Sequence, residues 1–342
     1  MVLMQINSVI YNVLKFEVKK YQVRPYQPND FDVWNAFVSV SKNATFLFNR
    51  NFMDYHSDRF QDFSLMVFDD EKLVAILPAN RVEDALFSHY GLTYGGLVLG
   101  EKAKLSTTIS IFRSILFFLN ENKIQKLTLK MIPKFYNSAF SDELDYCLFN
   151  ANAKLIRADS LSVIDLTKPY FISKTRKESI RRGEKNNLII KEELNFELFW
   201  NEILIPNLDK KHQVKPVHTV DEIQLLQTRF PRNIRHFNVY HNDKIVAGTT
   251  VFITDKVAHP QYISGNAAKN ELGSLDFLYH HLLTEVFTNK NYFDFGISNE
   301  EQGRKINEGL LFWKESFGAK TVVQNFYEVE TANYYLLDTV FI

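Results

Sequence analysis

Short runs of β-branched and aromatic residues, separated by polar turns, predict β-strands in both halves of the chain. Between them, apolar residues recur every three or four positions, which is typical of amphipathic helices. The predicted strands lie at 63–68, 73–81, 86–99, 127–132, 154–166, 188–191, 235–240, 244–254, 257–264, 291–297 and 320–327. The predicted helices lie at 28–40, 49–59, 106–119, 136–151, 173–185, 196–205, 219–229, 274–286 and 302–317. Ser106 or Thr107 is expected to cap the third of these helices and Ser274 the eighth.

One stretch of the first half nearly recurs in the second. The run from Val67 to Ala75 aligns without a gap on the run from Val239 to Ala247, an offset of 172 (239 minus 67) in a chain of 342 residues. The same offset places Tyr90 on Tyr262. Hairpins of this composition can recur by chance, because few residue types suit tight turns. Here, however, the order of the surrounding elements repeats as well. We therefore interpret the chain as a duplication, with a ligand-binding cleft expected at the seam.

The element order of each half resembles the acetyltransferase superfamily: helices, a three-stranded meander, a helix, a strand, a helix and a last strand. This predicts an α/β (α+β) protein with two tandem GNAT-like domains, each with its own mixed, mainly antiparallel twisted sheet flanked by helices. Pro169 interrupts the pattern, so the domains are placed at 1–165 and 166–342. Residues 327–342 are expected to pack back on the first domain.

Composition narrows the function classes. With 46% hydrophobic residues the chain can bury two cores, and Lys+Arg and Asp+Glu are equal at 40 each. Global charge therefore favours neither nucleic acid nor membrane, and any anion-binding surface must be local. The single cysteine, Cys147, lies in an apolar helical stretch and is expected to be a buried structural thiol.

Targeting signals are not recognised in the sequence. Residues 1–16 lack the basic lead and continuous apolar block of a signal peptide. The most apolar predicted helix, residues 109–119, contains Arg113 and is too short to span a bilayer. We expect a cytoplasmic protein without a transmembrane segment.

Three motifs carry a more specific resemblance. They are the strand motif Asp294-Phe295-Gly296, the helix end Trp313-Lys314-x-x-Phe317-Gly318, and the helix start Lys174-x-Arg176-x-x-x-x-Ile180-Arg181-Arg182. Together with the duplication, they resemble the FemAB-like transferases, which use tandem acetyltransferase-like domains to add amino acids from aminoacyl-tRNA to peptidoglycan precursors. The resemblance implies catalytic roles for Lys314 and Trp313, with Asp294, Gly296 and Asn299 near the substrate.

Lys314 has a physical role available in such a reaction. Acyl transfer to an amine passes through a tetrahedral oxyanion, which a fixed ammonium stabilises in a water-poor cleft. The alternative is that Lys314 is a last-turn cation that complements the dipole of its own helix.

The segment 174–185 is a candidate phosphate-binding surface. Lys174, Lys177, Arg181 and Lys185 are spaced three, four and four residues apart and so share a helical face. With Arg176 and Arg182 nearby, this face suits the phosphates of a tRNA, a nucleotide sugar or a lipid diphosphate. The alternative is an ordinary solvated face.

A third cluster of candidate substrate-binding residues lies in the first half. It consists of His56, Arg59, His89, Tyr94, Gly95 and Gly96. The glycine pair allows a ligand to approach the backbone closely, and a histidine can hold or deprotonate an amine. The alternative is a glycine bulge whose histidines satisfy buried backbone groups.

Several familiar sites are not recognised. The sequence has no Gly-x-Ser-x-Gly elbow, phosphate loop or dinucleotide fingerprint, and the adjacent His280 and His281 have poor metal-ligand geometry. The Arg/Gln-x-x-Gly-x-Gly/Ala signature of acetyl-CoA users is missing at 269–275 and at 99–105. We expect no metal and no tightly bound cofactor, with aminoacyl-tRNA or acyl-CoA as the acyl donor.

These inferences predict an acyltransferase that acts on an amine of a cell-envelope precursor, either peptidoglycan or a surface polysaccharide. The expected partners are that precursor, a tRNA, and the membrane surface through a lipid-linked substrate. Two alternatives stay open: an acyl-CoA-dependent N-acyltransferase on an amino sugar, and a non-catalytic member that binds a saccharide or a partner protein.

Overall fold

The structure is a computed structural model that describes residues 19–341. The stretch 1–16, considered above for a signal peptide, lies outside the described residues. The first half contains twelve main elements within the described chain, in this order: β1 (Gln22–Pro25), α1 (Phe31–Ser39), α2 (Arg50–Met53), β2 (Leu65–Asp69), β3 (Lys72–Leu77), β4 (Asn80–Val82), β5 (Ala85–Ser88), β6 (Val98–Leu99), α3 (Leu105–Glu121), β7 (Lys126–Lys130), α4 (Glu143–Asn150) and β8 (Lys154–Asp165).

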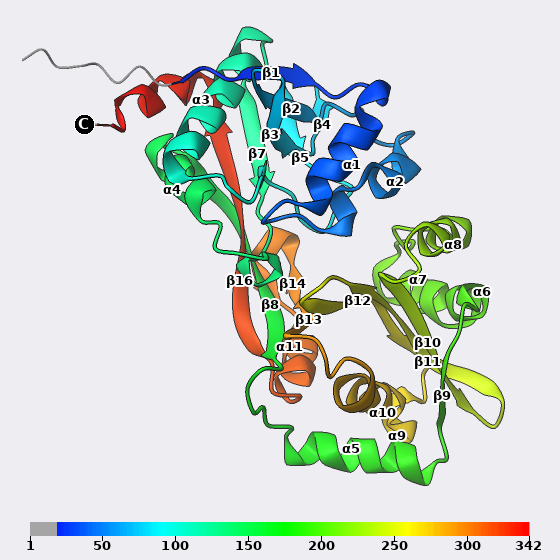
Figure 1. Ribbon diagram of the computed structural model, residues 1–342. Coiled ribbons are helices and arrows are strands. Elements are labelled where there is room, and N and C mark those ends of the chain that lie inside the picture. The colour runs from blue at the N-terminus through cyan, green and yellow to red at the C-terminus, as the bar shows by residue number, and fades with distance from the viewer. Residues whose placement is uncertain (1–18, 342) are drawn as a thin grey trace, which may run out of the picture.

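The second half opens with the basic helix and ends with a long strand (Figure 1). Its elements are α5 (Lys174–Lys185), β9 (Ile189–Glu192), α6 (Phe196–Phe199), α7 (Ile205–His212), α8 (Val220–Arg229), β10 (Ile234–His241), β11 (Lys244–Ile253), β12 (Val257–Gly265), α9 (Lys269–Leu272), α10 (Ser274–His281), β13 (Tyr292–Ile297), β14 (Asn299–Glu300), β15 (Lys305–Ile306), α11 (Glu308–Glu315) and β16 (Lys320–Glu330). A π-helical turn, Trp200–Leu204, joins α6 to α7, and a 3-10 helix, η8 (Thr331–Thr339), follows β16.

The prediction of an α/β protein with a mixed, mainly antiparallel sheet flanked by helices is confirmed, but the two halves do not have separate sheets. One four-stranded sheet has the order β1-β2-β3-β6, and a ten-stranded sheet has the order β4-β5-β7-β16-β8-β13-β12-β11-β10-β9. The reason is that the last strand of each half pairs with a strand of the other half. β8 from the first half pairs with β13, and the end of β16 pairs with β7, while β8 and β16 pair with each other. Figure 1 shows these two long strands running from one half into the other. The division near residue 165 therefore stays a proposal.

Backbone register supports the duplication. Val67 pairs with Ala75 and Val239 with Ala247, and in both hairpins the register shifts by a bulge immediately after that valine. The equivalence of Tyr90 and Tyr262 is wrong. Tyr90 lies exposed in a loop, whereas Tyr262 is buried in β12. The offset changes because β4 and β5 are inserted between β3 and β6.

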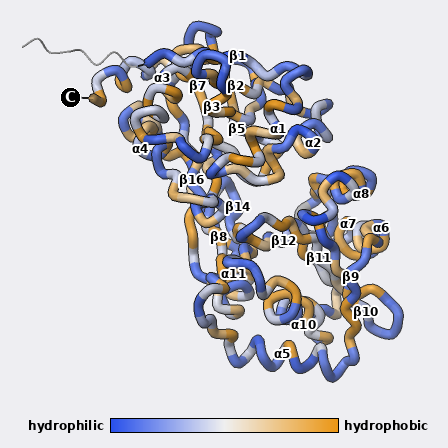
Figure 2. Tube along the Cα trace, in the orientation of Figure 1, coloured by the Kyte–Doolittle hydropathy of each residue, from blue (hydrophilic) through white to orange (hydrophobic). Residues whose placement is uncertain are grey.

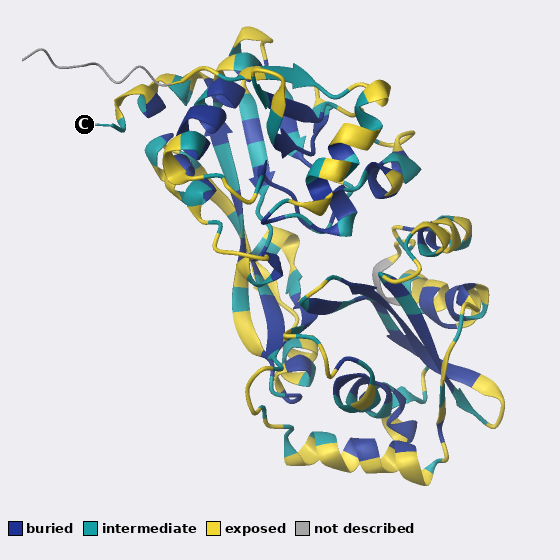
Figure 3. Cartoon of the chain, viewed as in Figure 1, coloured by how far each residue is buried: buried dark blue, intermediate teal, exposed yellow. Residues whose placement is uncertain are grey.

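Each half buries an apolar core between its sheet and its helices (Figure 3). α3 presents Ile109, Phe112, Leu116 and Leu119 to the core of the first half, as its pattern predicts. In the second half, Leu278 and Leu282 of the helix that follows β12 are fully buried. Figure 2 shows α5 as a largely hydrophilic helix, whereas the sequence of β11 is mostly apolar.

Several predicted elements differ in length. The strand expected at 86–99 is two strands, β5 and β6, separated by a loop, and the helices expected at 49–59, 136–151 and 302–317 shorten to α2, α4 and α11 with turns of 3-10 helix or loop beside them. The expected caps are wrong at α3 and α10, whose N-cap residues are Lys104 and Gly273 without a side-chain hydrogen bond. Cys147 is buried, and burial raises the pKa of its thiol to about 12.

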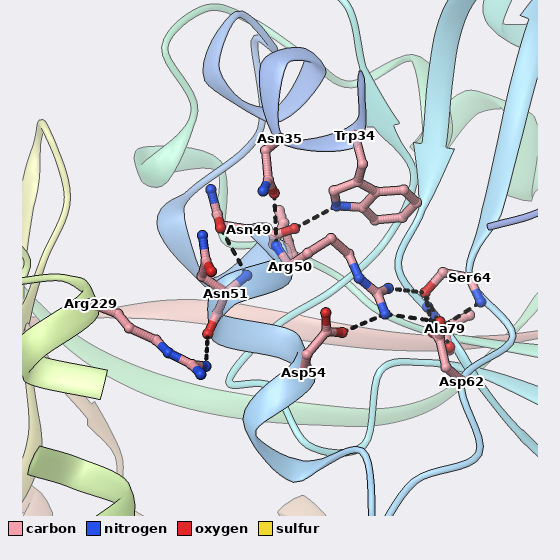
Figure 4. Close-up of polar contacts among 11 residues, drawn as sticks. Trp34, Asn35, Asn49, Arg50, Asn51, Asp54, Asp62, Ser64, Ala79 and Arg229 are labelled. Atoms are coloured by element: carbon pink, nitrogen blue, oxygen red, sulfur yellow. Dashed lines mark hydrogen bonds and ion pairs between the residues drawn. The ribbon is translucent and has the colours of Figure 1, made fainter. Parts of the chain in front are cut away.

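Polar contacts fix the first half internally and tie it to the second (Figure 4). The buried Arg50 guanidinium bonds Asp54 and Asp62, at 2.5 and 3.0 Å. Close by, the Arg229 side chain of α8 donates to the backbone oxygen of Asn51, at 2.8 Å. At the other end of the molecule, η8 lies on α3, where Arg113 pairs with Asp338 at 2.8 Å.

Candidate functional site

A cavity of about 1260 Å³ lies between the two halves. One wall is formed by β12, β13 and α11 of the second half. The opposite wall comes from the end of α2, the turn that follows it, and the loop between β5 and β6. Of the predicted site residues, eight line this cavity: His56, Arg59, Tyr94, Arg176, Asp294, Gly296, Trp313 and Lys314.

Lys314 is buried at this cavity with an exposed fraction of 2%. Its ammonium donates to the backbone oxygens of Gly296, at 3.0 Å, and Ile297, at 2.6 Å. These carbonyls belong to β13 and not to the end of its own helix, α11. Burial lowers the pKa of Lys314 to about 8, against a smaller opposing effect of Asp294. An ammonium has three hydrogens, so one remains for a ligand.

The strand motif forms a bulge beneath this lysine. β13 shifts register against β8 between Asp294 and Ile297, and Gly296 has a φ of +73°, a left-handed conformation that favours glycine. The Gly296 N–H donates to Asp294 Oδ1 at 2.8 Å. The bulge turns the carbonyls of Gly296 and Ile297 toward Lys314.

Asp294 is fully enclosed and has three polar neighbours. The Tyr136 hydroxyl from the first half donates to Oδ2 at 2.8 Å, and His259 Nδ1 lies 3.2 Å from the same oxygen. Burial alone would raise the pKa of Asp294, but His259, the Tyr136 hydroxyl and the Gly296 N–H together hold it below its ordinary value. The carboxylate therefore stays ionised at the seam between the halves.

Trp313 and Arg176 share one carboxylate. The Trp313 indole donates to Asp276 Oδ1 at 2.7 Å, and Arg176 pairs with the same oxygen at 2.6 Å. Arg176 also donates to Ser316 Oγ at 3.2 Å. This predicted substrate-binding arginine thus lines the cavity while being held by internal partners, and it fixes α5 against α10 and α11.

The opposite wall is aromatic. His56, exposed by 1%, stacks on Tyr55, whose other neighbour is His218, with ring centroids 4.3 and 5.2 Å away. Burial lowers the pKa of His56 to about 4, so its ring is neutral. Arg59 lies over the Tyr55 ring and pairs with Glu222 of α8 at 2.7 Å. The Tyr94 hydroxyl donates to Thr45 at 3.0 Å.

The remaining candidates of the first-half cluster lie away from the cavity. His89 accepts the Gly91 N–H at its Nδ1 atom, at 3.1 Å, and burial lowers the pKa of His89 to about 3. Gly95 and Gly96 line a second cavity of about 300 Å³. A Cβ on Gly95 would lie 1.7 Å from the Ser88 oxygen, so this glycine serves close backbone packing. A role of these three residues in substrate binding stays a prediction.

Asn299 and the basic helix also lie outside the cavity lining. Asn299 accepts the Ser160 N–H at 2.5 Å and so ties β14 to β8. Lys174 and Arg181 are exposed on α5 and form no ion pair within residues 19–341. Arg182 bonds Ser179 within the helix at 2.9 Å. The exposed cations of α5 therefore form a basic surface on the described part of the chain, and its role in binding phosphates stays a prediction.

Sequence reasoning missed four residues that line the cavity, His259, Asp276, His218 and Lys130, and also Tyr136, which donates to Asp294 from outside the lining. His259 lies in an ordinary strand pattern and Tyr136 in a segment assigned to a longer helix. Neither belongs to a motif, so only the three-dimensional pairing shows them.

Sequence comparisons identify no relative: no family model matches, and no curated protein matches. Solved structures do match. FemX aligns with a TM-score of 0.63 at 8% identity, covering 92% of this chain and 99% of that one.

The chain shares the fold of FemX, and two further structures share it as well. L-PGS from Bacillus licheniformis aligns with a TM-score of 0.52 at 10% identity over 92% of this chain and 97% of that one. A tandem GNAT protein of the clavulanic acid biosynthesis pathway aligns with a TM-score of 0.50 at 13% identity over 91% and 99%. At such identities the similarity establishes the fold alone. Within residues 19–341 there is no helix of the length and apolarity that crossing a membrane requires.

Proposed function

We propose that this protein transfers an acyl or aminoacyl group from an activated donor to an amine in the cavity between its halves. The observation that carries the proposal is the Lys314 ammonium, which is buried, fixed by two carbonyls of a bulged strand and placed at the cavity wall. Such a preorganised cation stabilises the oxyanion that forms when an amine attacks an acyl carbon.

The cavity is large enough for two reactants. Pockets for one small ligand typically hold about 300–1000 Å³, whereas this one measures about 1260 Å³. We propose that the donor carbonyl lies against Lys314 and that the acceptor extends along the aromatic wall of Tyr55 and His56. No residue of the protein needs to form a covalent intermediate, since positioning and charge supply the catalysis.

The surroundings of α10 favour a donor other than acetyl-CoA. In ordinary acetyl-CoA users, the helix N-terminus after the central strand holds the pyrophosphate through its N–H groups. Here α5 packs against the start of α10, so closely that a Cβ on Gly273 would lie 2.2 Å from the Ser179 oxygen. This supports aminoacyl-tRNA as the donor, with the exposed basic face of α5 as its contact surface.

We further propose that the acceptor is the amine of a cell-envelope precursor. One matched structure, from Agrobacterium fabrum, is the C-terminal domain of a putative lysylphosphatidylglycerol synthetase; it aligns with a TM-score of 0.54 at 13% identity over 77% of this chain and 83% of that one. A name of this kind describes aminoacyl transfer at the cell envelope, and it supports the envelope assignment by architecture alone.

The test is a product screen with isotope-labelled donors. Purified protein is incubated with a pool of charged tRNAs, or with acyl-CoAs, and with muropeptide precursors and amino sugars, and new amides are identified by mass spectrometry. A labelled amide formed from the tRNA pool supports the proposal. Micromolar CoA binding by calorimetry, with amides formed only from acyl-CoA, would replace it with the N-acyltransferase alternative. Tight glycan binding without any transfer would replace both.

A further inference from the structure

His259 lies where the central strands of the second half separate. β12 pairs in parallel with β13 at Val257 and Ala258, and His259 is the next residue. Its side chain lines the main cavity. The sequence gives no motif for this residue, and it lies 35 positions from its nearest polar partner, Asp294.

The contacts of His259 define its tautomer. Nδ1 lies 3.0 Å from the backbone oxygen of Asp294 and 3.2 Å from its carboxylate Oδ2. Both are acceptors, so Nδ1 carries a hydrogen, and the neutral ring has its lone pair on Nε2. Within residues 19–341, Nε2 has no hydrogen-bond partner. The basic nitrogen is therefore available at the cavity.

Asp294 orients this imidazole through the two contacts at Nδ1. The carboxylate is itself fixed by the Tyr136 hydroxyl and the Gly296 N–H, at 2.8 Å each. A histidine held by a buried, ionised carboxylate is the arrangement of a general base with its orienting group.

The His259 imidazole and the Lys314 ammonium both lie against Gly296. A Cβ built on Gly296 would lie 3.2 Å from His259 Cε1, so the ring edge covers that α-carbon. The Gly296 oxygen accepts from Lys314 at 3.0 Å. A base and a cation thus flank the same bulge in the cavity wall, within reach of the two ends of one reacting amine–carbonyl pair.

We propose that His259 is the general base of this protein, a role that rests on the acyl transfer proposed above. As the amine nitrogen bonds to the acyl carbon, the carbonyl π electrons move to oxygen beside Lys314, and an amine proton passes to Nε2 of His259. The oxyanion then reforms the carbonyl, the bond from the acyl carbon to the leaving oxygen or sulfur breaks, and His259 returns the proton to that atom. The products are an amide and a neutral alcohol or thiol.

The experiment compares His259→Ala and His259→Gln with the wild type in single-turnover transfer assays, with His241→Gln on the far hairpin as a matched control. We expect turnover to fall about 100- to 10000-fold, KM to change little, and added imidazole to restore part of the rate in His259→Ala. Thermal melts confirm that the variants are folded.

A readout independent of turnover is the tautomer of the His259 ring, followed by nitrogen NMR. The Nδ1–H tautomer is expected in the wild type, and Asp294→Asn, which removes the carboxylate acceptor, should raise the fraction of the Nε2–H tautomer. A normal rate in folded His259→Gln, or no imidazole rescue while Lys314→Met is still impaired, overturns the base and leaves the acyl transfer in place. Absence of transfer by the wild type overturns both.

Discussion

The two halves differ at two corresponding pairs of strands, β12 and β13 in the second half and β6 and β7 in the first. In the second half, β12 and β13 pair only at their first residues and then diverge, and the opening is lined by His259, Asp294 and Lys314. In the first half, the corresponding strands β6 and β7 do not pair, and the hairpin of β4 and β5 occupies the space, with β5 parallel to β7. One copy therefore keeps an open site, and the other supplies the facing wall.

The comparison shows how duplication separates two demands on a fold. An open gap in a sheet exposes backbone groups and polar side chains that cost stability. The filled gap of the first half satisfies its backbone, as in the Gly95 N–H that donates to the Lys130 oxygen at 2.7 Å. Stability and reactivity can then reside in different copies.

Within this comparison, the variant with the largest expected effect removes the cation from the open gap. Replacing Lys314 by methionine removes the ammonium and keeps much of the volume, so we expect turnover to fall about 100- to 1000-fold. The melting temperature should change little, because the cost of desolvating a buried cation offsets the loss of its hydrogen bonds to the Gly296 and Ile297 oxygens. The exposed Lys320→Met variant is the control. Equal rates for the two variants would remove Lys314 from the mechanism.

The second test replaces one glycine in each gap by alanine. Gly95→Ala places a methyl against the Ser88 oxygen in the filled gap and should lower the free energy of unfolding by about 3 kcal/mol. Gly296→Ala strains a left-handed residue by about 1–2 kcal/mol. It should mainly reduce turnover, by disturbing the bulge under Lys314. Urea titrations and transfer rates of both variants measure the contrast, and a reversed pattern would contradict it.

The pH profile gives a third test. Burial holds the pKa of Lys314 near 8, so the ammonium is present below that pH and is lost as the pH rises through it. Above pH 8, the transfer rate should fall by up to about tenfold for each unit. This falling limb should be absent in Lys314→Met. A wild-type rate that keeps rising to pH 10 would show that the charged form is not needed.

The smallest expected effect concerns the basic face of α5. Replacing Lys174 and Arg181 by glutamate should weaken tRNA binding and lower its salt dependence by about one unit of slope for each lost phosphate contact. The free energy of unfolding should stay unchanged, because both side chains are exposed. Lys72→Glu in the first half is the control, and filter binding at several salt concentrations is the measurement. Identical slopes for all three proteins would leave α5 as a solvated surface.

Local patterns predicted most of the hairpins and helices, because their contacts are close in sequence. The repeated valine bulge of β2–β3 and β10–β11 follows from matched turns, and the Lys314 motif pointed to a residue that the structure places at the main cavity. The exchange of β8 and β16 was not predictable, since it pairs strands more than 150 residues apart, such as Leu161 with Val322.

The site was only partly predictable for the same reason. Asp294 and Lys314 lie in motifs, whereas Tyr136 and His259 reach Asp294 through long-range packing that no local signal records. His89 and the glycine pair looked reactive because small and polar residues cluster there. In the structure, Gly95 lets its backbone pass close to the Ser88 oxygen, where a side chain would not fit.

The pairing of β8 and β16 with strands of the other half also affects the order in which the chain can fold during translation. β7 pairs with β5 on one side and with the end of β16 on the other, where Phe326 lies opposite Lys130, 196 positions earlier (326 minus 130). The first half therefore lacks one neighbour of β7 until β16 has been synthesised, with an exposed edge that invites mispairing in the meantime. A nascent chain arrested before residue 320 should bind holdase chaperones and resist proteolysis poorly.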